Sequence, residues 1–176
     1  LNREERVISV SPTFTMYRIT TKNHGCHYAE VPLNEDFSLN VDSLLSEAGT
    51  KTVLCFLSSP NNPTGNQFKC EDVVRIIEEF QGFVVIDEAY VHFASYSLVD
   101  MIDKFENLIV LRTFSKAFGL AGLRLGYSLA NSGVSKALRG IQLPFNVNKV
   151  SLVAARKVLE HREIVEDVVQ RVKYER

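Results

Sequence analysis

The sequence of 176 residues has no tryptophan, only two methionines and almost no net charge, which is -1 at neutral pH. With the charges balanced, nothing in the composition suggests the basic surface that nucleic-acid-binding proteins carry, so no nucleic-acid partner is predicted. No apolar run reaches the length of a membrane span, and we recognise no signal-peptide pattern. We therefore expect an ordinary soluble globular domain without a membrane partner.

Cysteine is also scarce, and the three cysteines are Cys26, Cys55 and Cys70. Their number is odd and their spacing matches no metal motif, so we expect reduced thiols in a cytoplasmic protein. His24 and His27 flank Cys26, but no further ligand follows at a useful spacing. No metal site is predicted.

Apolar segments and amphipathic segments alternate along the chain at intervals of roughly 25 residues, which is the rhythm of βαβ units. This alternation predicts an α/β fold, a three-layer α/β/α arrangement with a mostly parallel sheet. The predicted strands are 6–11, 27–31, 52–57, 83–86, 107–111 and 123–129. The predicted helices are 14–23, a short one ending at 47 and capped by Asn40 or Asp42, 71–80, 101–105, 132–140, 147–160 and one from 163 with the apolar stripe Ile164, Val165, Val168, Val169 and Val172.

The last two predicted strands are joined by only about ten residues, which are too few for the helical crossover that parallel strands need. We therefore expect the strand 123–129 to run antiparallel to its neighbour. Polar clusters follow four of the strands, at 12–17, 58–65, 87–90 and 113–116. Because ligands gather at the carboxyl ends of parallel strands, we expect these clusters to meet in space.

One cluster holds a lysine between hydroxyls and a later arginine. Lys116 follows Thr113 and Ser115, and Arg124 comes eight residues after it. Small and aromatic neighbours would partly desolvate the lysine amine and favour its neutral, nucleophilic form. We predict that Lys116 carries a cofactor aldehyde and that Arg124 and the hydroxyls hold a phosphate. From the pattern alone, Arg124 is equally well read as a surface residue of an edge strand.

Asp87 ends an apolar run, so its carboxylate would be partly desolvated and would need a cation or a strong donor. A helix cap or a surface turn is the alternative for this position. The glycines at 119, 122 and 126 form neither a dinucleotide fingerprint nor a Walker loop. The spacing of Thr113 and Lys116 is similar to an acyl-enzyme Ser-x-x-Lys motif, but the serine and its partner motifs are missing.

Three ordered motifs resemble the fold-type I, class I/II pyridoxal-phosphate-dependent aminotransferases. They are SPNNPTG at 59–65, DEAY at 87–90 and TFSKAFGLAGLRLGY at 113–127. The segments 12–17, 31–33 and 36–39 resemble more specifically the histidinol-phosphate aminotransferase branch of that family. The resemblance covers nearly all of this chain and corresponds to the middle of a full-length family member.

The resemblance implies a cofactor, pyridoxal 5'-phosphate, and a catalytic role for three residues. Lys116 would hold the cofactor covalently and later move a proton, as a general acid and base does. Asp87 would pair with the pyridinium nitrogen and keep the ring an electron sink. Tyr90, together with Asn62, would hydrogen-bond the phenolic oxygen of the ring.

The same resemblance implies that Phe14 stacks on the cofactor ring and that Thr113, Ser115 and Arg124 hold its phosphate. The implied reaction moves an amino group from glutamate to imidazole-acetol phosphate, reversibly, in histidine biosynthesis. Its substrates are small amino acids and oxo acids, and the implied assembly is a homodimer. Residues 1–147 would be most of the cofactor-binding large domain, and 148–176 helices leading toward a small domain. The N-terminal segment and the small domain lie outside this sequence, so we expect these residues alone to be inactive.

Other functions stay open on the sequence. A threonine-phosphate decarboxylase or an aromatic aminotransferase would share the same motifs. A non-enzymatic module that binds a phosphorylated ligand would also place Lys116 and Arg124 together, as charges that only pair.

Overall fold

The computed structural model describes residues 2–175 and contains a six-stranded sheet in the order β2-β1-β3-β4-β5-β6. Strands β1 to β5 are parallel, and β6 runs antiparallel to β5. This confirms the predicted α/β class, including the single antiparallel strand. The strands are β1 (Arg6–Ser11), β2 (His27–Pro32), β3 (Thr52–Ser58), β4 (Phe83–Asp87), β5 (Leu108–Thr113) and β6 (Gly126–Ala130).

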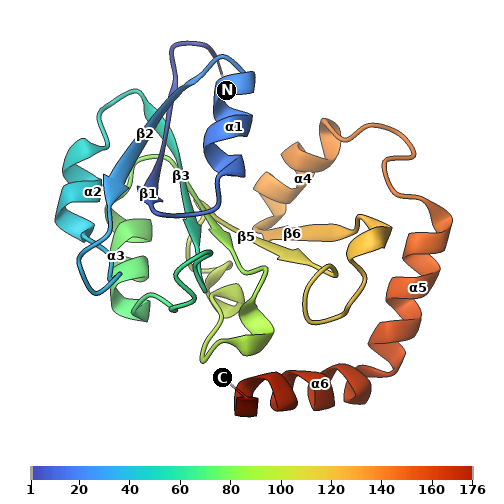
Figure 1. Cartoon of the computed structure of the whole chain (residues 1–176). Helices are drawn as coiled ribbons and strands as arrows, with labels where there is room; N and C mark the ends of the chain where they lie inside the picture. Colours follow the sequence, from blue (N-terminus) through green and yellow to red (C-terminus); the bar gives the residue numbers. More distant parts are fainter. Residues whose placement is uncertain (1, 176) are drawn as a thin grey trace.

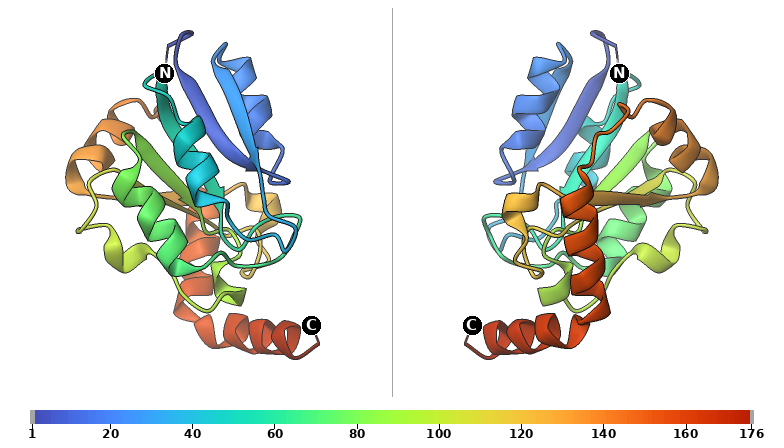
Figure 2. Two further views of the ribbon diagram at one scale, coloured as in Figure 1. Left: turned by 90° about the vertical axis from the view of Figure 1, so that its left-hand side faces the viewer. Right: turned by 90° about the vertical axis from the view of Figure 1, so that its right-hand side faces the viewer.

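Helices cover both faces of the sheet, as Figures 1 and 2 show. Helices α2 and α3 lie together on one face, and α1 lies on the other. The helices are α1 (Met16–Asn23), α2 (Val41–Glu47), α3 (Cys70–Glu79), α4 (Ser132–Gly140), α5 (Lys149–Glu160) and α6 (Arg162–Glu175), with 3-10 turns η1 (Val91–Phe93), η2 (Val99–Met101) and η3 (Ala121–Leu123). Of the two caps considered for α2, the structure has Asn40, whose side chain accepts from the Ser43 amide at 3.1 Å.

The main core lies between the sheet and helices α2 and α3. Alternate strand residues face the same side, so Ile8, Val84 and Ile86 point into this core, where Leu44 and Ile76 meet them from the helices. All five side chains are at most 1% exposed. Because helices cover both faces, the strands read as nearly continuous apolar runs, which is why they were recognisable in the sequence.

The turn before β6 differs from the prediction. The strand begins at Gly126 instead of residue 123, and Arg124 has a left-handed backbone with φ +50°. Pairing with β5 starts at Thr113 and Gly126, so the residues before Gly126 are used to reverse the chain. Glycine is required there, since a Cβ at 126 would lie 2.9 Å from the Arg112 carbonyl oxygen.

Helices α5 and α6 lie beyond β6, and α6 runs along the lower side of the molecule in Figure 1. Ala155 of α5 packs in a small cluster with Phe114 and Leu125. From α6, Val165 and Val169 pack with Ala117. Both helices therefore support the segment that carries Lys116, and the domain division at 147 stays a prediction.

The predicted stripe of α6 is only partly buried. Val165 and Val169 are at most 8% exposed, whereas the other three predicted members, Ile164, Val168 and Val172, are between 44% and 63% exposed. The helix meets the rest of the chain along a narrow line, so only one row of the stripe is covered.

Candidate active site

The four polar clusters lie at one edge of the sheet, because β1, β3, β4 and β5 are parallel and end there. Ser58 pairs with Asp87, and Asp87 pairs with Leu111 on the next strand. Thr113 is two residues further along β5, about 7 Å along the strand. The carboxylate that ends β4 and the hydroxyls that follow β5 are thus neighbours across two adjacent strands.

Asp87 is half-buried and accepts two hydrogen bonds. The hydroxyl of Tyr17 donates to Oδ2 at 2.8 Å, and the Ala89 amide donates to Oδ1 at 3.0 Å. The Tyr17 ring stacks on Phe56 with centroids 4.7 Å apart and planes within 4°. Burial, and then the Asp87 charge, raise the pKa of Tyr17 far above its ordinary value. The phenol therefore stays protonated at neutral pH and donates to the carboxylate.

Tyr17 was not among the predicted site residues. An aromatic side chain at helical spacing is typical of a core position, so nothing in the local pattern marks it. Phe14, which was predicted, lies edge-on to Tyr17 with centroids 5.6 Å apart, and it is 39% exposed. Its ring is therefore free enough at the edge of the sheet to contact a ligand.

The buried side chain of Asn61 joins two of the clusters. Thr13 donates to Asn61 Oδ1 at 2.8 Å, while Asn61 Nδ2 donates to the Pro12 carbonyl at 3.0 Å and to the Thr64 hydroxyl at 2.8 Å. All its polar atoms are thus used in holding the Phe14 segment against the loop of Asn62. This residue, too, was missed, because its partners Thr13 and Pro12 are 48 and 49 positions away in the sequence.

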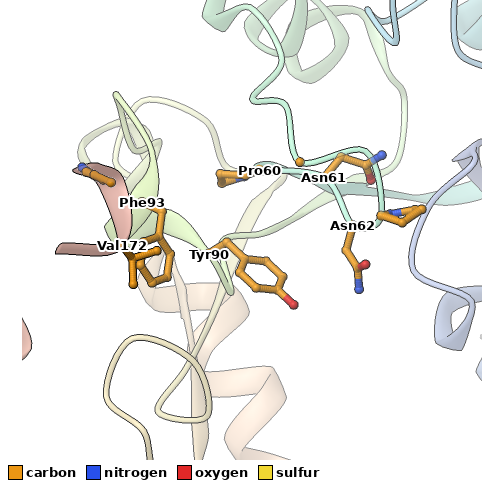
Figure 3. A pocket seen from close by; sticks show the side chains of 9 residues that line it. Pro60, Asn61, Asn62, Tyr90, Phe93 and Val172 are labelled. Carbon is orange, nitrogen blue, oxygen red and sulfur yellow. The ribbon is translucent and has the colours of Figure 1, made fainter. Parts of the chain in front are cut away.

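Asn62 and Tyr90 line a pocket of 420 Å³. In Figure 3 the Asn62 amide and the Tyr90 hydroxyl point to the same side, while Phe93 and Val172 meet at the other end. The structure therefore brings together the two residues predicted to share one ligand atom. The complete lining is Pro60, Asn61, Asn62, Pro63, Gly65, Tyr90, Phe93, Val172 and Lys173.

Lys116 lies above the Tyr90 ring, with Nζ 5.2 Å from the centroid. Its neighbours Phe114 and Ala117 are buried and anchor the turn. Lys116 itself is exposed, so the expected desolvation of its amine is wrong for this structure: the apolar neighbours point inward and leave the lysine outside. At the start of the turn, the Ser115 amide donates to Thr113 Oγ1 at 3.0 Å, and the two hydroxyl oxygens are 2.9 Å apart.

Arg124 is exposed, and its guanidinium donates to the Ala121 carbonyl at 3.0 Å. Within residues 2–175 no hydrogen bond joins it to Thr113 or Ser115. In the predicted strand position its side chain would have pointed out of one face of the sheet, whereas in the left-handed turn it bonds back to its own loop. Its role with the phosphate therefore stays a prediction.

A buried ion pair lies directly behind these residues. Glu88 is 2% exposed, and Arg112 donates to its Oε2 through Nε at 3.0 Å and Nη2 at 2.9 Å. Burial acts against the guanidinium charge, but the hydrogen bonds and the charge of Glu88 outweigh it and raise the pKa of Arg112. The pair was not predicted, because its members are 24 positions apart.

Cys26 and Cys55 are buried free thiols, and Cys70 is a partly exposed one. Over the described range 2–175, no group of three or more His, Cys, Asp or Glu side chains could hold a metal ion. In that range no helix is long and apolar enough to cross a membrane.

Comparison with known proteins relates this chain to a family of enzymes. The model of the class I and II aminotransferases matches residues 1–176. Histidinol-phosphate aminotransferase of Thermoanaerobacter pseudethanolicus is 46% identical over 160 residues, which are 90% of this chain and 46% of that protein. The Pyrococcus furiosus protein of the same name is 41% identical over 170 residues, or 97% and 50% of the two chains. The chain thus spans about half the length of the curated relatives it matches.

Solved structures of aminotransferases have a fold similar to that of this chain. Histidinol-phosphate aminotransferase from Sinorhizobium meliloti, in complex with pyridoxal-5'-phosphate, is similar with a TM-score of 0.89 at 27% identity, over 97% of this chain and 48% of that one. A Thermus thermophilus aspartate aminotransferase variant has a TM-score of 0.88 at 23% identity, over 99% and 48%. The second likeness, at that identity, speaks for the fold alone.

Proposed function

Because this chain belongs to the class I and II aminotransferase family, we propose that it provides the cofactor-binding part of a pyridoxal-phosphate-dependent aminotransferase. The observation that carries the proposal is the convergence of unlike groups at one sheet edge. A lysine, a carboxylate with a fixed donor, an amide with a phenol, and a pair of hydroxyls all follow adjacent strands.

The chemistry of these groups fits pyridoxal phosphate part by part. Asp87 offers an acceptor for a protonated ring nitrogen, and Asn62 with Tyr90 offers donors for a phenolic oxygen. Thr113 and Ser115 offer hydroxyls for a phosphate, as phosphate sites commonly use. When bound, the cofactor supplies an aldehyde for the amino group and a ring that accepts electrons.

In this proposal the residues of the chain hold the reactants and move protons. Tyr17 keeps Asp87 oriented, and Asp87 would in turn keep a proton on the ring nitrogen of the cofactor. Lys116 would hold the cofactor through its amine and, once the substrate amine has displaced it, would move a proton at the substrate α-carbon. Phe14 would cover the ring face, and Arg124 would hold the phosphate, for which its guanidinium would have to leave the Ala121 carbonyl.

The proposed substrates are histidinol phosphate and 2-oxoglutarate, in a step of histidine biosynthesis carried out by a cytoplasmic homodimer. The support is that the curated relatives at 39% to 46% identity are named histidinol-phosphate aminotransferases. We propose further that residues 1–147 are most of the large domain and that the helices in 148–176 lead toward a small domain.

The central test is chemical trapping on the full-length protein. Pyridoxal phosphate is added, the protein is reduced with borohydride, and the modified peptide is sequenced by mass spectrometry. The expected adduct is on Lys116, and Lys116→Ala abolishes it. Lys104, which lies beside Phe105 in a similar cation-π contact, provides the matched control Lys104→Ala. An adduct on another lysine of the intact protein would remove Lys116 from its role.

Substrate choice needs a separate assay. Histidinol phosphate with 2-oxoglutarate is expected to turn over faster than phenylalanine with 2-oxoglutarate, and equal rates would contradict the specific assignment. A second candidate is supported by the likeness to an L-threonine-O-3-phosphate decarboxylase from Porphyromonas gingivalis, at 28% identity and a TM-score of 0.77. Release of carbon dioxide from threonine phosphate, without transfer of its amino group, would favour that candidate.

A further inference from the structure

The carboxylate of Glu88 closes the loop that follows β4. At the far end of the loop, the Leu98 amide donates to Oε1 at 2.7 Å, and the Ser97 hydroxyl lies 2.9 Å from both carboxylate oxygens. At the near end, the Glu88 amide donates to the Leu111 carbonyl of β5 at 2.9 Å. Glu88 therefore holds both ends of residues 88–98, the near end through its backbone amide and the far end through its carboxylate.

Arg112, on the neighbouring strand β5, bonds to both Glu88 and the far end of the loop. Besides its two bonds to Glu88, its Nη2 donates to the Ser97 hydroxyl at 2.8 Å. Arg112 directly precedes Thr113, and Glu88 directly follows Asp87. The ion pair thus fixes three parts of the site against each other: the end of β4, the end of β5 and the loop between them.

Tyr90 and Phe93 lie on this loop, and both line the 420 Å³ pocket. The Tyr90 hydroxyl points to the same side as the Asn62 amide, and the ring faces Lys116. Tyr90 has no side-chain hydrogen bond among the contacts of residues 2–175 that would orient it. Its position follows from the backbone of the loop, and the loop is closed by Glu88.

We propose that Glu88 is a positioning residue, which acts through Tyr90 and sets the geometry of the cofactor's phenolic oxygen site. This inference rests on the proposed function. It assigns a task to a buried acid that contacts none of the groups expected to touch the cofactor. The two neighbouring acids then have separate roles, since Asp87 would face the cofactor and Glu88 would hold the loop that carries Tyr90.

Glu88→Gln is the informative substitution. It keeps the size of the side chain and an oxygen for the Leu98 amide. However, it removes the charge and places an amide N–H group against the donors of Arg112. Either the hydrogen bonds from Arg112 or the hydrogen bond from the Leu98 amide must then break. Ser97→Ala is a milder change, because it deletes only the hydroxyl between the carboxylate and the loop.

The test is a double-mutant cycle on purified full-length protein, with Glu88→Gln, Tyr90→Phe and the double variant. The dissociation constant of pyridoxal phosphate and the pH midpoint of its visible absorbance are measured by titration. We expect Glu88→Gln to weaken binding at least about tenfold, which corresponds to about 1.4 kcal/mol. In the Tyr90→Phe background, its effect should shrink to half or less on a logarithmic scale, because the residue through which it acts is gone.

An equal effect of Glu88→Gln in both backgrounds, or any effect that shrinks by less than half, overturns the inference. If Glu88→Gln does not fold, Ser97→Ala replaces it in the same cycle under the same criterion. Glu79→Gln is the matched control, because Glu79 pairs with Arg75 at 2.7 Å on the exposed side of α3 and should leave both readouts unchanged. Failure of the wild type to bind pyridoxal phosphate, or an unshifted band in Tyr90→Phe, would instead contradict the proposed function.

Discussion

Tyr17→Phe removes one oxygen from the candidate site and little else. The phenol hydroxyl donates to Asp87 at 2.8 Å, whereas the ring is held separately by its stacking on Phe56. Phenylalanine keeps that ring, so the helix α1 should remain packed on the sheet. The substitution therefore isolates the hydrogen bond to the carboxylate that the proposed cofactor would use.

The expected size of the effect follows from the surroundings of the bond. Tyr17 is 6% exposed and donates to a carboxylate, and a hydrogen bond to a charged group contributes about 1.5–3 kcal/mol. Asp87 is half-buried, so water replaces part of the lost donor and places the effect at the lower end. We expect the free energy of unfolding to fall by about 1.5 kcal/mol. Affinity for pyridoxal phosphate should fall about tenfold, because the carboxylate is no longer held in one orientation.

The assay pairs urea denaturation with a cofactor titration followed by visible absorbance. Tyr28→Phe is the control, since burial also raises the pKa of Tyr28 but its side chain lies on β2. It should leave cofactor affinity unchanged. The reasoning is refuted if Tyr17→Phe binds pyridoxal phosphate within about twofold of the wild type, a difference below about 0.5 kcal/mol.

Three further predictions concern stability and reactivity. Burial raises the pKa of Tyr96 to about 12 and that of Tyr17 still further. The protonated phenols therefore stabilise the fold below about pH 10, and denaturant titrations should show the free energy of unfolding falling as the pH rises above that value. A flat profile up to about pH 12 would contradict this. Burial raises the pKa of Cys55 to about 12, so a thiol reagent should label Cys70 first in the native protein, and rapid labelling of Cys55 would be the contrary result. Ile76→Ala, in the core of α3, should cost about 2–5 kcal/mol in urea unfolding, and a loss below about 1 kcal/mol would mean that the core closes around the gap.

The strands were predictable because their signal is local. A run such as Phe83 to Ile86 is apolar throughout, and the structure extends the strand by only one residue, to Asp87. The antiparallel direction of β6 was also predictable, since the length of a connection limits what it can join. The start of β6 was not, because it depends on where β5 ends and on the close approach of Gly126 to Arg112.

The site was predictable to the extent that strand ends determine it. Asp87, Asn62 and Tyr90 lie where the parallel edge places them. The contacts that orient these residues were not predictable, because they join positions far apart: Tyr17 meets Asp87 across 70 residues, and Asn61 meets Thr13 across 48. Such pairs leave no periodicity or spacing in the sequence.

The adjacent acids Asp87 and Glu88, at the end of β4, lie on opposite faces of the sheet and therefore have different surroundings. Successive residues of a strand face opposite sides of the sheet, and Glu88, the first residue after β4, continues this alternation because its amide still bonds to Leu111 of β5. Asp87 lies with Tyr17, on the face that α1 covers, and Glu88 lies with Leu98, whose side chain belongs to the core under α2 and α3. A shift of β4 by one residue would exchange the two faces and bury the wrong carboxylate. The register of β4 between β3 and β5 therefore decides which acid is open to a ligand and which is sealed in the closure of the loop.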